Sequence, residues 1–201
     1  MIFAGAFVIG FTKTGIKGLL MLVIPLFASV FGAKESTGIV LLMLIVGDIF
    51  AVFFYSRHAD WTSIKKLILW IAVGLILGVT VGTLINDSQF KALIAVIVLI
   101  CLVVLLYSEK KGDALKVPNK LWFYALMGIL TGFASMIGNA AMPIFSIYML
   151  AMDYKKNNYM GTIAWLFFIL NLAKVPLQIF VWNNISIDTF LLFSTTLPAI
   201  A

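Results

Sequence analysis

The sequence predicts an all-α fold, a polytopic bundle of transmembrane helices. Hydrophobic residues make up 63% of the 201 residues, charged residues make up 11%, and the mean hydropathy is +1.13. A soluble domain is about 45–50% apolar and about 25% charged. The charges lie between apolar runs, several of them near the roughly 20 residues that a membrane-spanning helix needs. The net charge of +6 therefore indicates basic loops beside a membrane, with no nucleic-acid partner.

The chain opens with a broken apolar segment. The apolar runs on either side of residues 10–18 are each short for a membrane span, and the stretch GFTKTGIKG between them is polar and rich in glycine. Irregular polar backbone at membrane depth is tolerated only where protein buries it or where it lines a cavity. Transporters hold ions and anions at such breaks. A short loop is then expected at 33–36, followed by a span at 37–56.

Two further apolar segments complete the first half, at 67–85 and 92–107. Gly74, Gly78 and Gly82 recur every four residues in the first of these segments, which places them on one helical face. Small residues at this spacing let membrane helices approach closely, so this face is predicted to pack against another helix. The polar stretch at 109–120 is the predicted boundary between the two halves.

The second half repeats the order of the first. Residues 121–138 are apolar, 139–143 interrupt them, 144–152 resume the apolar run, and 160–182 form a long span. An offset of 123 places Gly15 on Gly138, Gly38 on Gly161 and Asp48 on Asn171. We therefore predict two inverted repeats, 1–108 and 121–201, joined by a cytoplasmic loop at 109–120. Each repeat opens with a broken helix or a helical hairpin, and the second is expected to lack its last one or two spans.

The distribution of basic residues favours the hairpin. If both broken segments cross the membrane once, seven basic loop residues lie on one side and four on the other. If both fold back, the split is nine to two. The second split agrees better with the excess of Lys and Arg in cytoplasmic loops. It places the loops near residues 57–66, 109–120 and 153–158 in the cytoplasm and the N-terminus outside.

Four charged residues lie in apolar surroundings: Lys13, Lys17, Asp48 and Lys174. Each costs about 2.5–3.5 kcal/mol at the centre of a membrane helix, so each should face protein or water. The two N-terminal lysines either converge on one ligand or extend to a nearby interface. Asp48 needs a partner, and Lys174 is the obvious candidate. Their pairing is either purely structural or part of substrate or proton coupling.

These residues suit a small oxyanion. Lysine acts on a compact anion as a point charge, and glycine lets backbone N–H groups approach a ligand closely. Hydroxyl and amide groups at the two breaks add neutral donors. The predicted substrate-binding residues are Thr12, Lys13, Thr14, Gly15, Lys17, Gly18, Ser135, Asn139, Asn171 and Lys174, with Asp48 and Lys174 as the coupling or ion pair.

The segment FTKTGIKG at 11–18 resembles the K-x-G-x-x-G opening of the TauE/SafE family of sulfite exporters. The runs GDIFAVFFYSRHADW and MGTIAWLFFILNLAKVP are similar to later motifs of that family. The resemblance covers essentially the whole chain and implies a permease for sulfite or organosulfonates that is coupled to an ion gradient. The residues of this chain that match the family's motifs by position are Lys13, Asp48, Asn171 and Lys174, so the resemblance implies a functional role for them. Lys17 and the glycine-poor break at 139–143 depart from the family pattern.

The preferred reading is a secondary transporter in the bacterial cell membrane, with a proton or sodium ion as the coupling ion and no cofactor. An anion channel, or a transporter of another small oxyanion or a carboxylate, remains open, as does a homo-oligomeric assembly. A membrane scaffold is a further alternative. A membrane-embedded enzyme is disfavoured because His58 is the only histidine, and because no nucleophile–base pair lies within the apolar segments.

Overall fold

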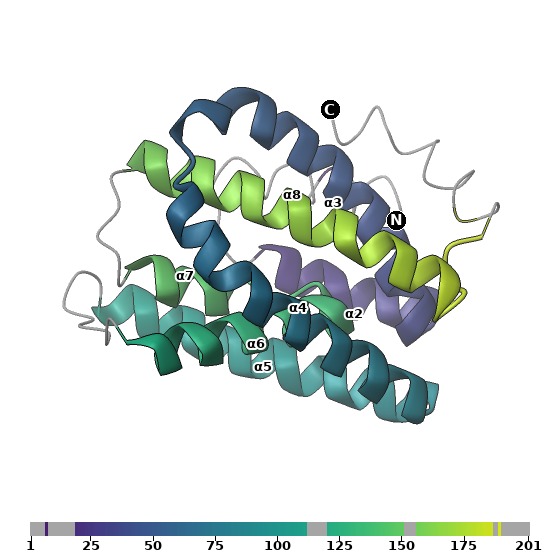
Figure 1. Cartoon of the computed structure of the whole chain (residues 1–201). Coiled ribbons are helices and arrows are strands. Elements are labelled where there is room, and N and C mark those ends of the chain that lie inside the picture. The colour runs from purple at the N-terminus through teal and green to yellow at the C-terminus, as the bar shows by residue number, and fades with distance from the viewer. Residues whose placement is uncertain (1–6, 8–18, 112–119, 151–155, 187–188, 190–201) are drawn as a thin grey trace.

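The computed structural model describes residue 7 and residues 19–111, 120–150, 156–186 and 189. This part of the chain holds seven α-helices and one 3-10 turn, and no strand (Figure 1). In chain order they are α2 (Leu19–Phe31), α3 (Ala33–Tyr55), η1 (Ser56–His58), α4 (Trp61–Leu84), α5 (Asp87–Lys111), α6 (Leu121–Gly138), α7 (Met142–Leu150) and α8 (Lys156–Phe180).

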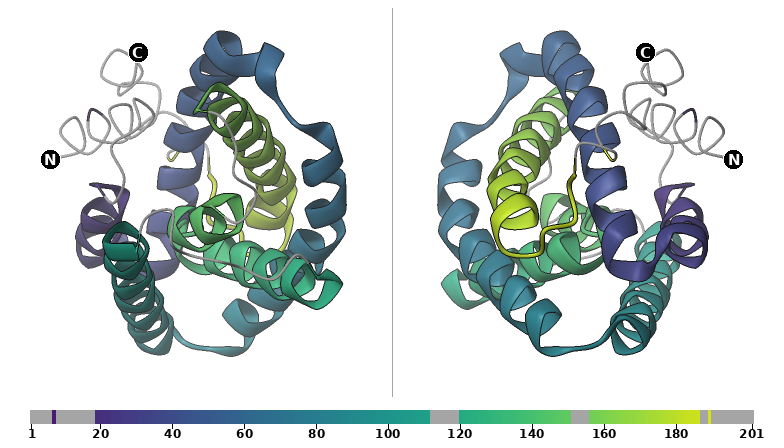
Figure 2. Two further views of the ribbon diagram at one scale, coloured as in Figure 1. Left: turned by 90° about the vertical axis from the view of Figure 1, so that its left-hand side faces the viewer. Right: turned by 90° about the vertical axis from the view of Figure 1, so that its right-hand side faces the viewer.

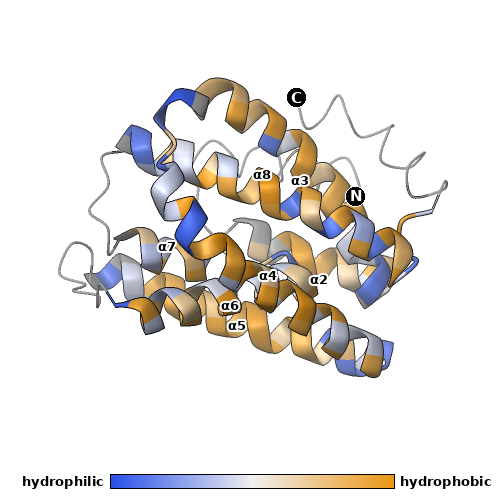
Figure 3. Ribbon diagram, viewed as in Figure 1, coloured by the Kyte–Doolittle hydropathy of each residue, from blue (hydrophilic) through white to orange (hydrophobic). Residues whose placement is uncertain are grey.

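Five of the helices, α3, α4, α5, α6 and α8, are long and apolar enough to cross a membrane. Helices α2 and α7 have only 13 and 9 residues and follow the two predicted breaks. Apolar residues cover the helices along most of their length, and hydrophilic residues gather toward the two ends of the bundle (Figure 3). The protein is therefore an all-helical, multi-pass membrane protein, as predicted.

The second broken segment folds back on itself. Helix α6 leaves one end of the bundle and α7 returns toward that end (Figure 1). The ring of Tyr124, near the start of α6, lies edge-on to the ring of Tyr148, near the end of α7, with centroids 5.6 Å apart. Helix α7 lies between α3 and α8 on one side and α5 and α6 on the other (Figures 1 and 2). This hairpin is the arrangement that the distribution of basic residues favours.

Contacts near the ends of the helices define the two ends of the bundle. At one end the Lys66 ammonium lies 6.0 Å from the Tyr124 ring centroid, and the backbone N–H of Asp60 donates to Thr162 Oγ1 at 2.9 Å. At the other end Asn184 Nδ2 donates to the carbonyl oxygen of Lys34 at 2.8 Å. The first of these is called the basic end below, because its exposed side chains include Arg57, Lys65, Lys66, Lys110 and Lys120.

The predicted loop at 33–36 is wrong, because α3 already begins at Ala33. The chain turns at Gly32 alone, whose φ of 91° is the left-handed conformation that glycine adopts most easily. The Asp87 carboxylate then accepts hydrogen bonds from the backbone N–H groups of Ala33 and Lys34 at 3.4 and 3.2 Å. A side chain from α5 thus satisfies N–H groups that a helix start leaves without partners.

The predicted glycine packing face is confirmed. A Cβ atom on Gly74 would collide with the carbonyl oxygen of Ile129 in α6, and one on Gly78 would lie 2.7 Å from Met136 Cβ. The contact is reciprocal, since a Cβ on Gly132 of α6 would collide with the carbonyl oxygen of Ile71 in α4. Helices α4 and α6 therefore touch backbone to backbone, which holds the hairpin against the first half of the chain.

Candidate functional site

A buried hydrogen bond joins the two halves of the chain. Helices α3 and α8 run antiparallel, and Asn171 Nδ2 of α8 donates to Asp48 Oδ2 of α3 at 2.6 Å. Both side chains are almost wholly buried, at 0% and 1% exposed. These two residues are 123 positions apart, the offset that aligns the two halves. Residues that correspond in the two halves therefore meet where α3 and α8 cross.

Lys174 is fully buried and lies against the break between α6 and α7. Its ammonium donates to the carbonyl oxygen of Ser135 at 3.1 Å, to Ser135 Oγ at 3.0 Å and to Asn139 Oδ1 at 2.5 Å. The Ser135 carbonyl belongs to the last turn of α6, where the carbonyl groups carry the partial negative charge of a helix C-terminus. Lys174 therefore acts as a cationic cap on the C-terminus of α6.

Asn139 directly follows the last residue of α6 and caps its C-terminus. Its φ of 53° and ψ of 20° place it in the left-handed region, which asparagine tolerates better than other non-glycine residues. Its backbone N–H donates to Ser135 at 3.0 Å, and its Nδ2 donates to the carbonyl oxygen of Thr37 in α3 at 3.2 Å. The break predicted at 139–143 is therefore a tight turn at Asn139, Ala140 and Ala141, tied to both α3 and α8 by one amide side chain.

Three further buried polar residues extend this network toward the end of α8. Gln178 Nε2 lies 3.3 Å from Thr37 Oγ1, and Asn184 Nδ2 lies 3.2 Å from the same oxygen. None of the three was predicted as a site residue. Asn171, Lys174 and Gln178 recur at i, i+3 and i+7 in the apolar run 160–182, which puts them on one helical face. That spacing is a signal from which Gln178 could have been found.

The structure brings together the predicted residues of the second half and of α3. Ser135, Asn139 and Lys174 form one cluster, and Asp48 and Asn171 form another one helical turn along α8. The remaining predicted site residues, Thr12, Lys13, Thr14, Gly15, Lys17 and Gly18, lie outside the described residues.

The described site combines two opposite charges with neutral polar groups. Its charged side chains are one carboxylate and one ammonium, and its other groups are amides and hydroxyls. Within the described residues, no group of three His, Cys, Asp or Glu side chains is placed to hold a metal ion. Ionisable side chains within membrane helices are costly to bury, and they commonly mark the path of a substrate or an ion.

Comparison with known families agrees with this chemistry. The family model "Sulfite exporter TauE/SafE" matches residues 2–201. The chain belongs to the TauE/SafE family. This TauE/SafE protein is therefore a membrane transporter for sulfite or a related sulfur-containing anion, since that is what the family description implies. No curated protein and no solved structure matches the chain.

Proposed function

We propose that this TauE/SafE protein is an ion-coupled secondary transporter that binds sulfite or an organosulfonate between its two broken segments. The observation that carries the proposal is the fully buried Lys174 ammonium, which contacts Ser135 and Asn139 at the second break. On this proposal Ser135, Asn139, Asn171 and Lys174 form one side of the anion site. Thr12, Lys13, Thr14, Gly15, Lys17 and Gly18 form the other side.

Helix electrostatics support an anion at the second break. Where one helix ends and another begins, the C-terminal carbonyls of α6 would repel an anion, and the N-terminal N–H groups of α7 would attract it. Lys174 offsets the partial negative charge at the C-terminus of α6 by donating to the Ser135 carbonyl oxygen. The Lys174 ammonium then acts on a small anion such as sulfite through its charge, since its N–H groups bond Ser135 and Asn139.

Asp48 is the proposed coupling residue. Asp48 and Lys174 are the buried charged side chains in the described part of the chain. Asp48 accepts from Asn171 at 2.6 Å and so joins α3 of the first half to α8 of the second. A proton or sodium ion that neutralised the carboxylate would weaken its hydrogen bond to the amide, since bonds to ionised acceptors are about twice as strong as neutral ones. Coupling-ion binding would thereby change how tightly the two halves are joined.

We also propose that the halves, 1–108 and 121–201, are inverted repeats with the basic end in the cytoplasm of a bacterial cell. The antiparallel α3 and α8 and the Asp48–Asn171 contact support the repeat. The exposed basic side chains at one end support the orientation, since cytoplasmic loops carry the excess of Lys and Arg.

Counterflow in proteoliposomes tests the proposal. Purified protein is reconstituted with millimolar unlabelled sulfite inside the vesicles, and uptake of trace ³⁵S-sulfite is followed. A transporter accumulates the label transiently, and an anion channel does not. Lys174→Met should abolish the overshoot, and the exposed Lys91→Met is the matched control that should leave it intact. The proposal fails if sulfite, taurine and sulfoacetate all give no counterflow, or if Lys174→Met matches wild type.

A further inference from the structure

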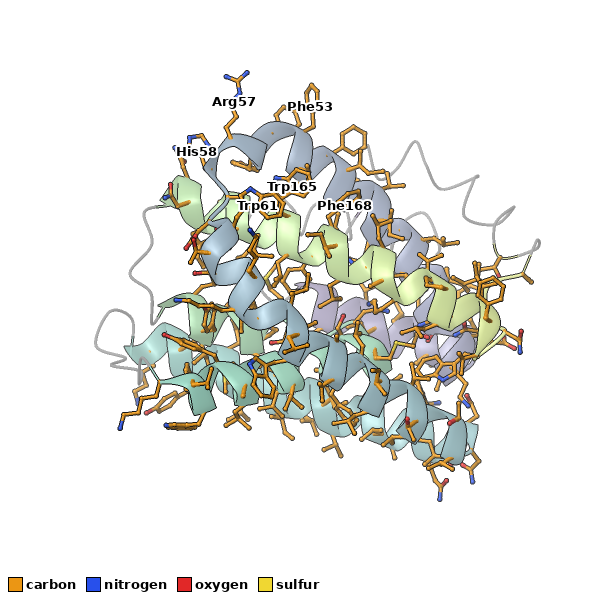
Figure 4. The ribbon with its side chains drawn as sticks, viewed as in Figure 1. Phe53, Arg57, His58, Trp61, Trp165 and Phe168 are labelled. Carbon is orange, nitrogen blue, oxygen red and sulfur yellow. The ribbon has the colours of Figure 1, made fainter. Side chains whose placement is uncertain are left out.

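The corner between α3 and α4 at the basic end carries exposed cations beside exposed aromatic rings. Arg57 and His58 lie in the turn η1, and their side chains point away from the helices (Figure 4). Phe53 and Phe54, one turn before them, are 79% and 72% exposed. Because α3 is an apolar span that ends at Tyr55, the chain leaves the hydrocarbon layer at this corner. The cations therefore lie at the depth of the lipid headgroups.

The corner is held rigidly by α8. Gly161 lets the α8 backbone approach the turn closely, since a Cβ there would lie 2.7 Å from the Tyr55 carbonyl oxygen and 2.8 Å from the His58 carbonyl carbon. The Asp60 N–H donates to Thr162 Oγ1 at 2.9 Å. Asn171 and Asp48 lie further along the same two helices, so α3 and α8 stay in contact from the corner to the buried site.

Three aromatic rings, those of Trp61, Trp165 and Phe168, form a row near the turn η1. The Trp61 ring at the start of α4 lies 5.1 Å from the Trp165 ring of α8, and Trp165 lies 6.1 Å from Phe168. Figure 4 shows the three rings below Arg57, on the outer surface of α4 and α8. Tryptophan is enriched at headgroup depth because it has an apolar ring and a polar N–H, and exposed phenylalanines pack against acyl chains.

The corner between α3 and α4 carries a net positive charge. Its acidic side chain, Asp60, accepts from the N–H groups of Thr62 and Ser63 at 2.9 and 3.4 Å and from Ser63 Oγ at 2.8 Å, which directs it to the start of α4. Exposed Lys65 and Lys66 follow on α4. The guanidinium of Arg57 can bind a phosphate through two parallel N–H groups, which a lysine cannot do.

We propose that this corner binds the headgroup of an anionic phospholipid. Arg57 and His58 contact the phosphate, and Trp61, Trp165 and Phe53 contact the glycerol backbone and the first acyl carbons. The inference does not depend on which anion the protein transports. A lipid seated across α4 and α8 would also brace the contact between the two halves, so its loss should lower thermal stability.

Native mass spectrometry of the purified full-length chain tests the site. Phosphatidylglycerol or phosphatidylcholine is added in turn to the protein in a neutral detergent, and the bound lipid is counted. Wild type should retain phosphatidylglycerol and not phosphatidylcholine. Arg57→Gln should weaken retention about fivefold, as expected for one basic residue near an anionic headgroup. Arg57→Lys should recover part of it, and Lys91→Gln, an exposed lysine on α5, should bind as wild type does.

Two results would overturn the proposal. One is equal retention of phosphatidylglycerol by wild type and by the Arg57→Gln/His58→Gln variant, with both proteins monodisperse. The other is equal retention of the two lipids by wild type. Inorganic phosphate at 10 mM serves as a competitor and should leave the lipid bound, because it lacks the acyl chains that the aromatic rings contact; complete displacement would equally contradict a lipid site.

Discussion

Replacing Lys174 by methionine tests whether the buried ammonium holds the break between α6 and α7. Methionine has a similar length and no charge, so the substitution removes the hydrogen bonds to Ser135 and Asn139 and leaves the buried volume nearly unchanged. The Ser135 carbonyl and Asn139 Oδ1 then lose a donor in a buried site. We expect Lys174→Met to be inserted in the membrane but clearly less stable than wild type.

The magnitude follows from the three hydrogen bonds. Interhelical hydrogen bonds in membrane proteins average about 0.6 kcal/mol, which gives a lower bound of about 2 kcal/mol. Bonds to a charged donor contribute about 1.5 kcal/mol or more each, which gives about 4.5 kcal/mol. At roughly 2–4 °C per kcal/mol for a chain of this size, the melting temperature should fall by about 4–18 °C. Thermal unfolding in detergent, followed by tryptophan fluorescence, measures this shift.

The sign of the change in melting temperature shows whether the Lys174 ammonium stabilises the break. If the ammonium were merely buried and poorly bonded, methionine would remove its desolvation cost and the variant would melt at or above the wild-type temperature. That result would refute the cap on α6 and the anion site built around it. Lys91→Met, which removes an exposed lysine from α5, should shift the melting temperature by less than about 4 °C, because exposed charges contribute about 0–1 kcal/mol.

Three other substitutions probe the packing, the coupling residue and the N-terminal segment. Gly132→Leu should separate α4 from α6 at the Ile71 carbonyl and cost about 1–3 kcal/mol or more, seen as a lower melting temperature in detergent; an unchanged value would mean that the helices do not touch there. Asp48→Asn should change the dependence of sulfite flux on pH if the carboxylate carries the coupling proton, and an unaltered profile would leave Asp48 as a structural partner of Asn171. Lys13→Ala should abolish flux with normal insertion, and wild-type flux would remove Lys13 from the proposed site.

Much of the fold could be predicted because membrane spans depend on local composition. The helix at 121–138 has the predicted bounds, and α3, α4, α5 and α8 lie within a few residues of the predicted apolar runs. The short loop at 33–36 was mispredicted because its polar residues look like a turn. The N–H groups that begin α3 there are satisfied by Asp87, a residue 54 positions away from Ala33 along the chain.

The buried polar residues show what the apolar pattern could and could not indicate. Asp48, Asn171 and Lys174 stand out in the sequence because a polar side chain within a membrane span is expensive and needs a partner. Their partners could not be predicted with the same certainty. The Asp48–Lys174 pair stays a prediction; Lys174 donates to Ser135 and Asn139, and Asp48 accepts from Asn171.

Composition and span length are local properties of the chain, so the sequence was enough to predict the helical membrane class. Which polar groups meet depends on how the helices cross, and this is decided by contacts between distant residues. The close approach of Gly74 to Ile129 and of Gly132 to Ile71 brings α6 against α4. The left-handed turn at Asn139 brings α7 back between the longer helices. Lys174 caps α6 only because both of these conditions hold.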